Sequence, residues 1–157
     1  MHFSRISLLL AASITIAAGA ANAAPTCTFL QPIGSDSNNP VVTKKLSRVK
    51  AIPFTKTNWN TDFAVNQPYT SFKFFFTADS ADAKAKYPVE GFMKFSDGTS
   101  LQVINENMSP PIGTGRMFGP FAAVPGKQAS QMNFKVGDSS NPAAIGFSYR
   151  ISVQGCR

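Results

Sequence analysis

The chain reads IGFSYRISVQ from Ile145 to Gln154, with a large apolar side chain at every second position. Glycine, serine, arginine and glutamine fill the positions between. Successive side chains of a β-strand point to opposite faces of the sheet, so this period of two predicts a strand with one buried face. The strand runs directly into Cys156.

The same alternation recurs at intervals along the chain. Phe72, Phe74 and Phe76 share one face of a predicted strand, opposite Lys73, Phe75 and Thr77. Asp97-Gly98 supplies the positive φ angles of a tight turn, which predicts a hairpin over residues 92–104. Further strands are expected at residues 27–31, 55–65, 117–124 and 128–136.

About eight short strands separated by Gly-, Pro-, Ser- and Asn-rich loops predict an all-β fold. We expect an antiparallel β-sandwich, with a small β-barrel as the alternative. Residues 41–52 fit either of two structures. Asn39-Pro40 followed by Val42, Leu46 and Val49 has helical spacing, whereas the Val and Thr content favours a strand.

Residues 1–23 have the composition of a bacterial-type signal peptide. Arg5 precedes an apolar run from Ile6 to Ala18, and Ala21-Asn22-Ala23 offers a small-x-small cleavage site. The run is shorter than the roughly 18 apolar residues that a membrane span requires, and no later segment is long enough. We therefore expect a secreted or periplasmic protein with no membrane span and a single domain over residues 24–157.

Cleavage after residue 23 removes one arginine, which leaves 14 lysines and arginines against 8 acids and a net charge of +6. Such a charge favours anionic partners, although scattered lysines also serve solubility alone. Cys27 and Cys156 are the chain's two cysteines, near opposite ends of the mature chain. In an oxidising compartment we expect them to form one disulfide, which would place the first and last strands side by side. Free thiols and intermolecular pairing are the alternatives.

The mature chain lacks the side chains that most catalytic and metal sites use. His2 is the sole histidine and lies in the predicted signal peptide, which excludes Ser-His-Asp and Cys-His machinery and imidazole ligands. Disulfide-bonded cysteines would exclude thiolate chemistry as well. We expect a non-enzymatic protein without a cofactor or metal, and keep a hydrolase based on paired carboxylates as an alternative.

Two of three candidate binding sites contain cations. Four cations, Lys44, Lys45, Arg48 and Lys50, fall within seven residues that contain no acid, and such a run can contact phosphate or sulfate groups. A solvated strand edge guarded by lysine has the same composition. A Pro- and Gly-rich loop over residues 107–116 ends in Arg116 and is a candidate contact with a partner or a simple crossover between sheets.

Phe75 is the third candidate, because it points away from the apolar face that Phe72, Phe74 and Phe76 share. An outward aromatic ring can stack on a sugar or a protein, or be covered by a loop. These features together predict a binding module for an envelope or extracellular partner, such as a protein, a glycan or an anionic envelope component. The alternative is a structural or adhesive subunit that self-assembles through strand edges.

Overall fold

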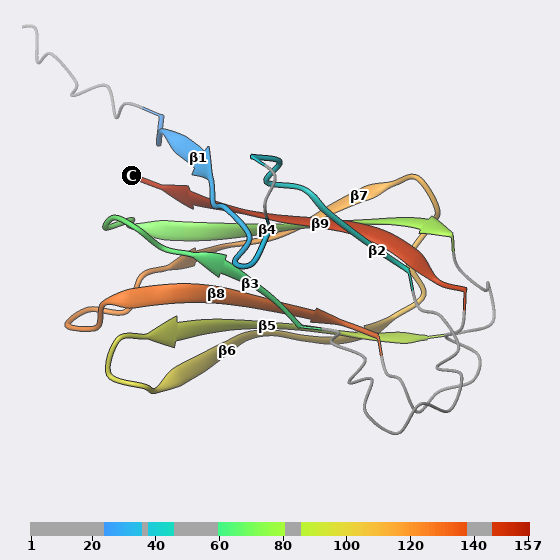
Figure 1. Cartoon of the computed structure of the whole chain (residues 1–157). Helices are drawn as coiled ribbons and strands as arrows, with labels where there is room; N and C mark the ends of the chain where they lie inside the picture. Colours follow the sequence, from blue (N-terminus) through green and yellow to red (C-terminus); the bar gives the residue numbers. More distant parts are fainter. Residues whose placement is uncertain (1–23, 36–37, 46–59, 81–85, 138–145) are drawn as a thin grey trace, which may run out of the picture.

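The structure, a computed structural model, describes residues 24–35, 38–45, 60–80, 86–137 and 146–157. These residues form nine β-strands in two antiparallel sheets that pack face to face (Figure 1). No helix in them is long and apolar enough to cross a membrane. The predicted signal peptide lies outside the described residues.

The five-stranded sheet, here called sheet A, has the order β1-β9-β4-β7, and β2 pairs with β9 beside β1. Its strands are β1 (Cys27–Phe29), β2 (Val42–Lys45), β4 (Ser71–Ser80), β7 (Gly115–Ala122) and β9 (Ser148–Cys156). The four-stranded sheet, sheet B, has the order β3-β8-β5-β6. Its strands are β3 (Asn60–Ala64), β5 (Tyr87–Phe95), β6 (Ser100–Met108) and β8 (Ala129–Val136).

The topology is that of one long hairpin rolled up on itself. The hairpin has its tip between β5 and β6, and its successive pairs are β4 with β7, β3 with β8, and β2 with β9. Rolling adds the pairs β4 with β9 and β5 with β8, which close the two sheets. The eight strands β2 to β9, paired in this way in two sheets, form a jelly roll. The predicted sandwich is confirmed, and the barrel is excluded.

Most of the predicted strands are confirmed within the described residues, with ends that shift by a few positions. The last strand is Ser148–Cys156, and its alternating large side chains Tyr149, Ile151 and Val153 are buried as the pattern predicted. The ambiguous segment is a strand over Val42–Lys45, and residues 46–52 lie outside the described residues. The predicted loop at 107–116 is shorter, because β6 continues to Met108 and β7 begins at Gly115.

Aromatic rings fill the space between the sheets. Phe134 of sheet B makes edge-on contacts with Phe74, Phe76 and Phe118 of sheet A, at centroid distances of 5.4, 6.4 and 6.3 Å. Edge-on pairs of this kind contribute about 0.5–1.5 kcal/mol each beyond the area they bury. The inward period-two faces of both sheets therefore meet in one continuous core.

The disulfide joins the first strand to the last. Cys27 and Cys156 are direct partners in the antiparallel pairing of β1 with β9, and their sulfur atoms are bonded. The bond encloses nearly the whole domain, because 129 positions separate the two residues. The predicted pairing and the predicted neighbourhood of the first and last strands are confirmed, and a disulfide fits an oxidising compartment.

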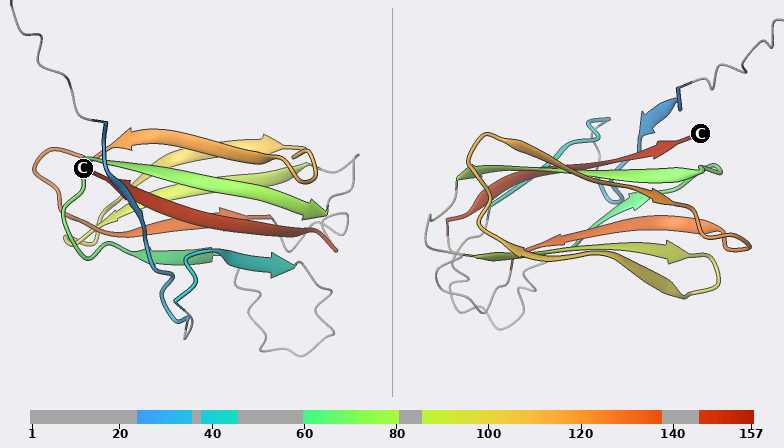
Figure 2. Two further views of the ribbon diagram at one scale, coloured as in Figure 1. Left: turned by 90° about the horizontal axis from the view of Figure 1, so that it is seen from above. Right: turned by 180° about the vertical axis from the view of Figure 1, so that it is seen from behind.

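The segment between β1 and β2 closes one side of the sandwich. After Leu30, whose amide donates to the carbonyl of Val153 in sheet A, the chain crosses to sheet B. There the amide of Ile33 donates to the carbonyl of Asp62, and the carbonyl of Gln31 accepts from the amide of Ala64. The chain then returns to sheet A as β2 (Figure 2). This crossing segment covers the outer edge of β3 along part of its length.

The edge strands β6 and β7 are interrupted. In β7, Gly119 and Pro120 face the single residue Lys73 of β4 and form a bulge, and Pro120 has no amide hydrogen to offer a new strand. In β6, Val103 has no partner in the pairing with β5 and forms a bulge. Glu106 of the same strand faces inward and carries a charge. Bulges, prolines and inward charges are features that keep sheet edges from pairing with other chains.

The predicted hairpin turn is stabilised by two of its own side chains and by Lys127. The carboxylate of Asp97 accepts hydrogen bonds from the amide and hydroxyl of Thr99, at 2.9 and 2.6 Å, and from Lys127 at 2.9 Å. The Thr99 hydroxyl bond, followed by the Thr99 amide and Lys127, lowers the pKa of Asp97 to about 2. Gly98 adopts φ +81°, which matches the sequence prediction of a positive φ angle.

We expect Thr99→Ala to raise the pKa of Asp97 toward its ordinary value, because the strongest hydrogen bond to the carboxylate is lost. In the wild type the stabilisation from this carboxylate is complete above about pH 4 and is lost as the pH falls toward 2. NMR titration of the Asp97 carboxyl carbon measures the change. Ser100→Ala is the matched control, and an unaltered titration curve in Thr99→Ala would contradict this account of the turn.

Candidate functional site

The described candidate residues all belong to sheet A, where they are spread across the sheet. Lys44 and Lys45 lie on the edge strand β2, Phe75 on β4, and Arg116 on the opposite edge strand β7. Arg48 and Lys50 lie outside the described residues. The sheet therefore does not bring the described candidates into one cluster, and each has its own surroundings.

Lys44 lies over the gap between the two sheets. Its Nζ donates a 2.7 Å hydrogen bond to the backbone carbonyl of Asn60 at the start of β3. Burial lowers the pKa of Lys44, while the carboxylate of Asp62 opposes this shift. Lys44 thus links β2 to β3, whereas its neighbour Lys45 is exposed on the outer side of sheet A.

Arg116 has partners within the domain. Its guanidinium forms an ion pair with Glu106 of β6 at 2.6 Å and lies 4.6 Å from the centroid of the Phe118 ring. These contacts connect the edge strands of the two sheets. Both ion-pair side chains remain about two-fifths exposed, so a partner could still reach them, but binding there would compete with the Glu106 contact.

Phe75 belongs to an apolar patch on the outer face of sheet A. Its ring centroid is 6.1 Å from that of Phe29 on β1, and Met117 of β7 is its direct cross-strand partner. Phe29 and Met117 are 45 and 48% exposed, and together with Phe75 they place three large apolar side chains side by side on the face of a sheet. We call Phe29, Phe75 and Met117 the outer apolar patch.

Cations lie on the same face as this patch. Lys73 precedes Phe75 by two positions on β4 and shares its outward direction, and Lys45 lies on the same face near the end of β2. Arg150 of β9 also points outward and pairs with Asp79 at 2.9 Å. These three cations and one carboxylate give the face a net positive charge. Figure 2 (left) shows this sheet from above.

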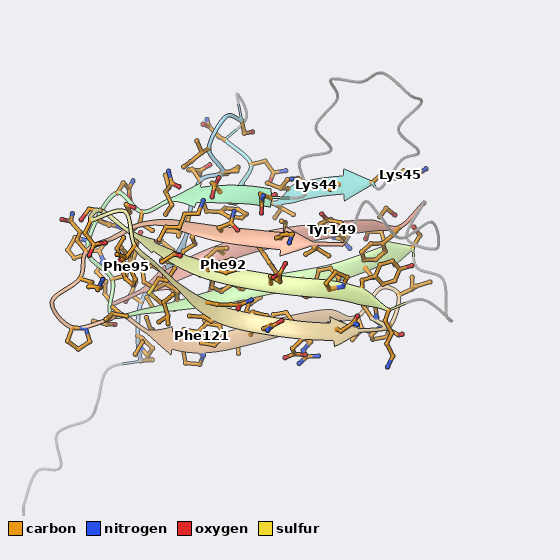
Figure 3. The ribbon with its side chains drawn as sticks, turned by 90° about the horizontal axis from the view of Figure 1, so that it is seen from below. Lys44, Lys45, Phe92, Phe95, Phe121 and Tyr149 are labelled. Carbon is orange, nitrogen blue, oxygen red and sulfur yellow. A yellow bond between two sulfur atoms is a disulfide. The ribbon has the colours of Figure 1, made fainter. Side chains whose placement is uncertain are left out.

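The outer face of sheet B is polar, with one aromatic ring at its centre. A single row of cross-strand partners runs over the four strands in the order Asp62, Asn133, Phe92 and Gln102. Figure 3 is seen from below and shows Phe92 near the middle of this face, with Lys44 at its margin.

The carboxylates have cationic partners. Asp62 pairs with Lys94 and Glu90 with Lys135, and each of the other acids among the described residues also forms an ion pair. Those acids are Asp79, Asp97 and Glu106. Within the described part of the chain, no cluster of three metal-ligating His, Cys, Asp or Glu side chains occurs.

Sequence reasoning missed Phe29 and Met117, because neither stands out in its own segment. The period-two pattern gave the outward direction of Phe75 but could not say which strands lie beside β4. Asp62 and Asn133 are likewise 71 positions apart and become neighbours through the pairing of β3 with β8.

Comparison with known proteins adds little to this description. No family model and no curated protein matches the chain. A chain from the structure of infectious bursal disease virus Gt strain superposes with a TM-score of 0.36 and 12% sequence identity. The match covers 83% of this chain and 32% of that chain, so this chain spans about a third of that chain's length. A similarity this weak carries no argument about function.

Thr61 is a polar side chain in the interior between the sheets. It is 8% exposed, and its hydroxyl oxygen has no hydrogen-bond partner within the described residues. It lines a groove of about 430 Å³ between β2, β3 and the crossing segment, together with Lys44 and Asn39. An unpaired buried hydroxyl costs free energy, because it has given up its bonds to water without replacing them.

We therefore expect Thr61→Val to raise the free energy of unfolding by about 1 kcal/mol, since valine fills a similar volume without the unpaired hydroxyl. Urea denaturation of the oxidised protein measures the change. The control is Thr43→Val on the neighbouring strand β2, where the side chain is exposed and the effect should stay within about 0.5 kcal/mol. A destabilised Thr61→Val would mean that the hydroxyl has a partner, such as a bound water.

Proposed function

We propose that this protein is an exported, non-catalytic binding module, and that its partner is an anionic, partly apolar component of the cell envelope. The observation that carries the proposal is the outer apolar patch of Phe29, Phe75 and Met117, flanked by Lys73 and Arg150, with Lys45 farther along the same face. The predicted signal peptide supports the exported location.

The patch is not required by the core. Phe72, Phe74 and Phe76 already supply the inward face of β4, and they are 0–1% exposed. Phe75 points the other way and contacts Phe29 on the solvent side, where polar residues would keep the sheet equally well paired. Three apolar side chains placed together on a solvent-facing sheet suit an apolar contact with another molecule.

The cations on the outer face of sheet A indicate which kind of molecule would bind there. Lys73 makes no ion pair with any residue that the structure describes, and the mature chain carries an excess of positive charge. Anionic headgroups with adjoining acyl chains would match cations around an apolar centre. The expected affinity combines a salt-sensitive part from the cations with a salt-insensitive part from the patch.

Assembly through strand edges has less support. The crossing segment covers part of the β3 edge, while β6 and β7 carry bulges, an inward charge or a proline. The remaining edge is divided between two short strands, β1 and β2. The second of these, β2, ends in two lysines. Each edge thus carries a feature that opposes pairing with another chain.

We expect the oxidised mature protein to bind vesicles that contain phosphatidylglycerol, and not vesicles of phosphatidylcholine alone. Phe75→Ser should weaken this binding about tenfold, because most of the gain from burying one phenylalanine is lost. Co-sedimentation at low and high salt measures the affinity, and raising the salt should weaken but not abolish it.

The matched control is Phe92→Ser, which removes an outward phenylalanine from the opposite sheet face. It should bind vesicles as the wild type does. Equal binding by Phe75→Ser and the wild type would exclude the outer apolar patch as the contact. Absence of binding to anionic vesicles at low salt would refute the proposal as a whole.

The features at the strand edges also predict the oligomeric state. We expect light scattering after size-exclusion chromatography to report a monomer at both low and high salt, at micromolar protein concentrations. Oligomers or filaments that grow with concentration would instead favour the structural-subunit hypothesis, and would direct mutagenesis to the sheet edges.

A further inference from the structure

The outer face of sheet B has a composition that differs sharply from that of sheet A. Phe92 is surrounded by polar side chains on both neighbouring strands, with Asn133 of β8 on one side and Gln102 of β6 on the other. Along β5 its outward neighbours are Glu90 and Lys94. Phe92 is therefore the one large apolar side chain that the described sheet places in the middle of this face.

The carboxylate of Asp62, which lies on the other side of Asn133 from Phe92, is held in one orientation. Oδ1 of Asp62 accepts hydrogen bonds from Lys94 at 2.7 Å and from Asn133 at 2.9 Å. Within the described part of the chain, no hydrogen bond reaches its second oxygen, Oδ2. A fixed carboxylate with an unused oxygen is a prepared acceptor for a ligand hydroxyl, because little side-chain entropy remains to be lost on binding.

The carboxylates on this face are paired with ammonium groups. Asp62 pairs with Lys94, and Glu90 pairs with Lys135 at 2.5 Å. The Gln102 amide extends the second pair through a 3.4 Å hydrogen bond to Glu90. Both carboxylates are thus already paired with ammonium groups, and Lys44 at the margin of the face also interacts with Asp62. Ions that are already paired offer hydrogen bonds that suit a neutral polar ligand better than an ion.

The surface between these groups is hollowed. A shallow depression of about 370 Å³ has Phe92 and Asn133 in its lining, together with Asp62, Lys94, Ser100 and Asn60. This volume lies at the lower end of the range of about 300–1,000 Å³ that small-molecule sites occupy. The depression therefore combines an aromatic surface, a carboxylate, an ammonium group and a hydroxyl within the space of a small ligand.

We infer that this depression is a binding site for a neutral saccharide, separate from the proposed envelope contact on sheet A. A pyranose ring has an apolar face of C–H groups and a rim of hydroxyls. The C–H face would stack on Phe92 while the rim hydroxyls donate to Oδ2 of Asp62 and accept from Lys94 and Ser100. Few other neutral ligands need an aromatic platform and converging hydrogen bonds of both kinds.

The experiment is an NMR titration of the oxidised mature protein with linear oligosaccharides of glucose, mannose, galactose and N-acetylglucosamine at millimolar concentrations. Amide shifts should change on β3, β8 and β5 around Asp62, Asn133 and Phe92. Phe92→Ala should weaken the affinity at least about tenfold, whereas Phe92→Trp should retain it. Asp62→Asn should weaken binding through loss of the charged acceptor.

The control is Phe75→Ser, which should bind the oligosaccharide as the wild type does. High salt should leave the affinity unchanged, which distinguishes this site from the salt-sensitive contact on sheet A. Backbone spectra of each variant confirm that it is folded. Absence of shifts on this face with every oligosaccharide would overturn the inference, and so would full affinity in a folded Phe92→Ala variant.

Discussion

The ring of Phe134 is the contact on which the two-sheet arrangement depends. It belongs to sheet B and meets three phenylalanines of sheet A edge-on, two from β4 and one from β7. Because β4 and β7 are both held against this one ring, the distance and rotation between the sheets are fixed near the middle of the core. Tyr87 and Phe147 form a second contact, stacked at 3.9 Å, in the same core.

This packing determines which residues face outward. Side chains alternate along a strand, so fixing Phe74 and Phe76 in the core leaves Phe75 on the surface of sheet A. Fixing Met93 in the core in the same way leaves Phe92 on the surface of sheet B. The two outward rings lie on opposite faces, one among cations and one among paired ions, and this difference allows each face its own ligand chemistry.

Much of the fold could be predicted from local patterns. The alternation in β4 and β9, the Asp97-Gly98 turn and the pairing of the cysteines each depend on a few neighbouring residues or on elimination. Strand order could not be predicted, because the pairing of β2 with β9 or β3 with β8 joins segments far apart in the chain. Residues 41–52 fitted both a helix and a strand for the same reason, since β9 provides the partner that makes Val42–Lys45 a strand.

The candidate sites show the same limit. Phe75 could be singled out because its neighbours in sequence define the inward face. Its companions Phe29 and Met117 come from strands whose position beside β4 depends on the rolled topology. Arg116 stood out as the cation of a Pro- and Gly-rich loop, but sequence gave no sign that Glu106, on the strand before that loop, would pair with it.

The position of the disulfide has a mechanical consequence. Cys27 and Cys156 lie opposite each other where the first and last strands pair, so residues 28–155 are enclosed within one covalent loop. A pulling force applied to the chain outside the two cysteines passes from one sulfur atom to the other and does not reach the sheets. While the bond is oxidised, the domain transmits tension without unfolding; once it is reduced, the same force peels β1 from β9.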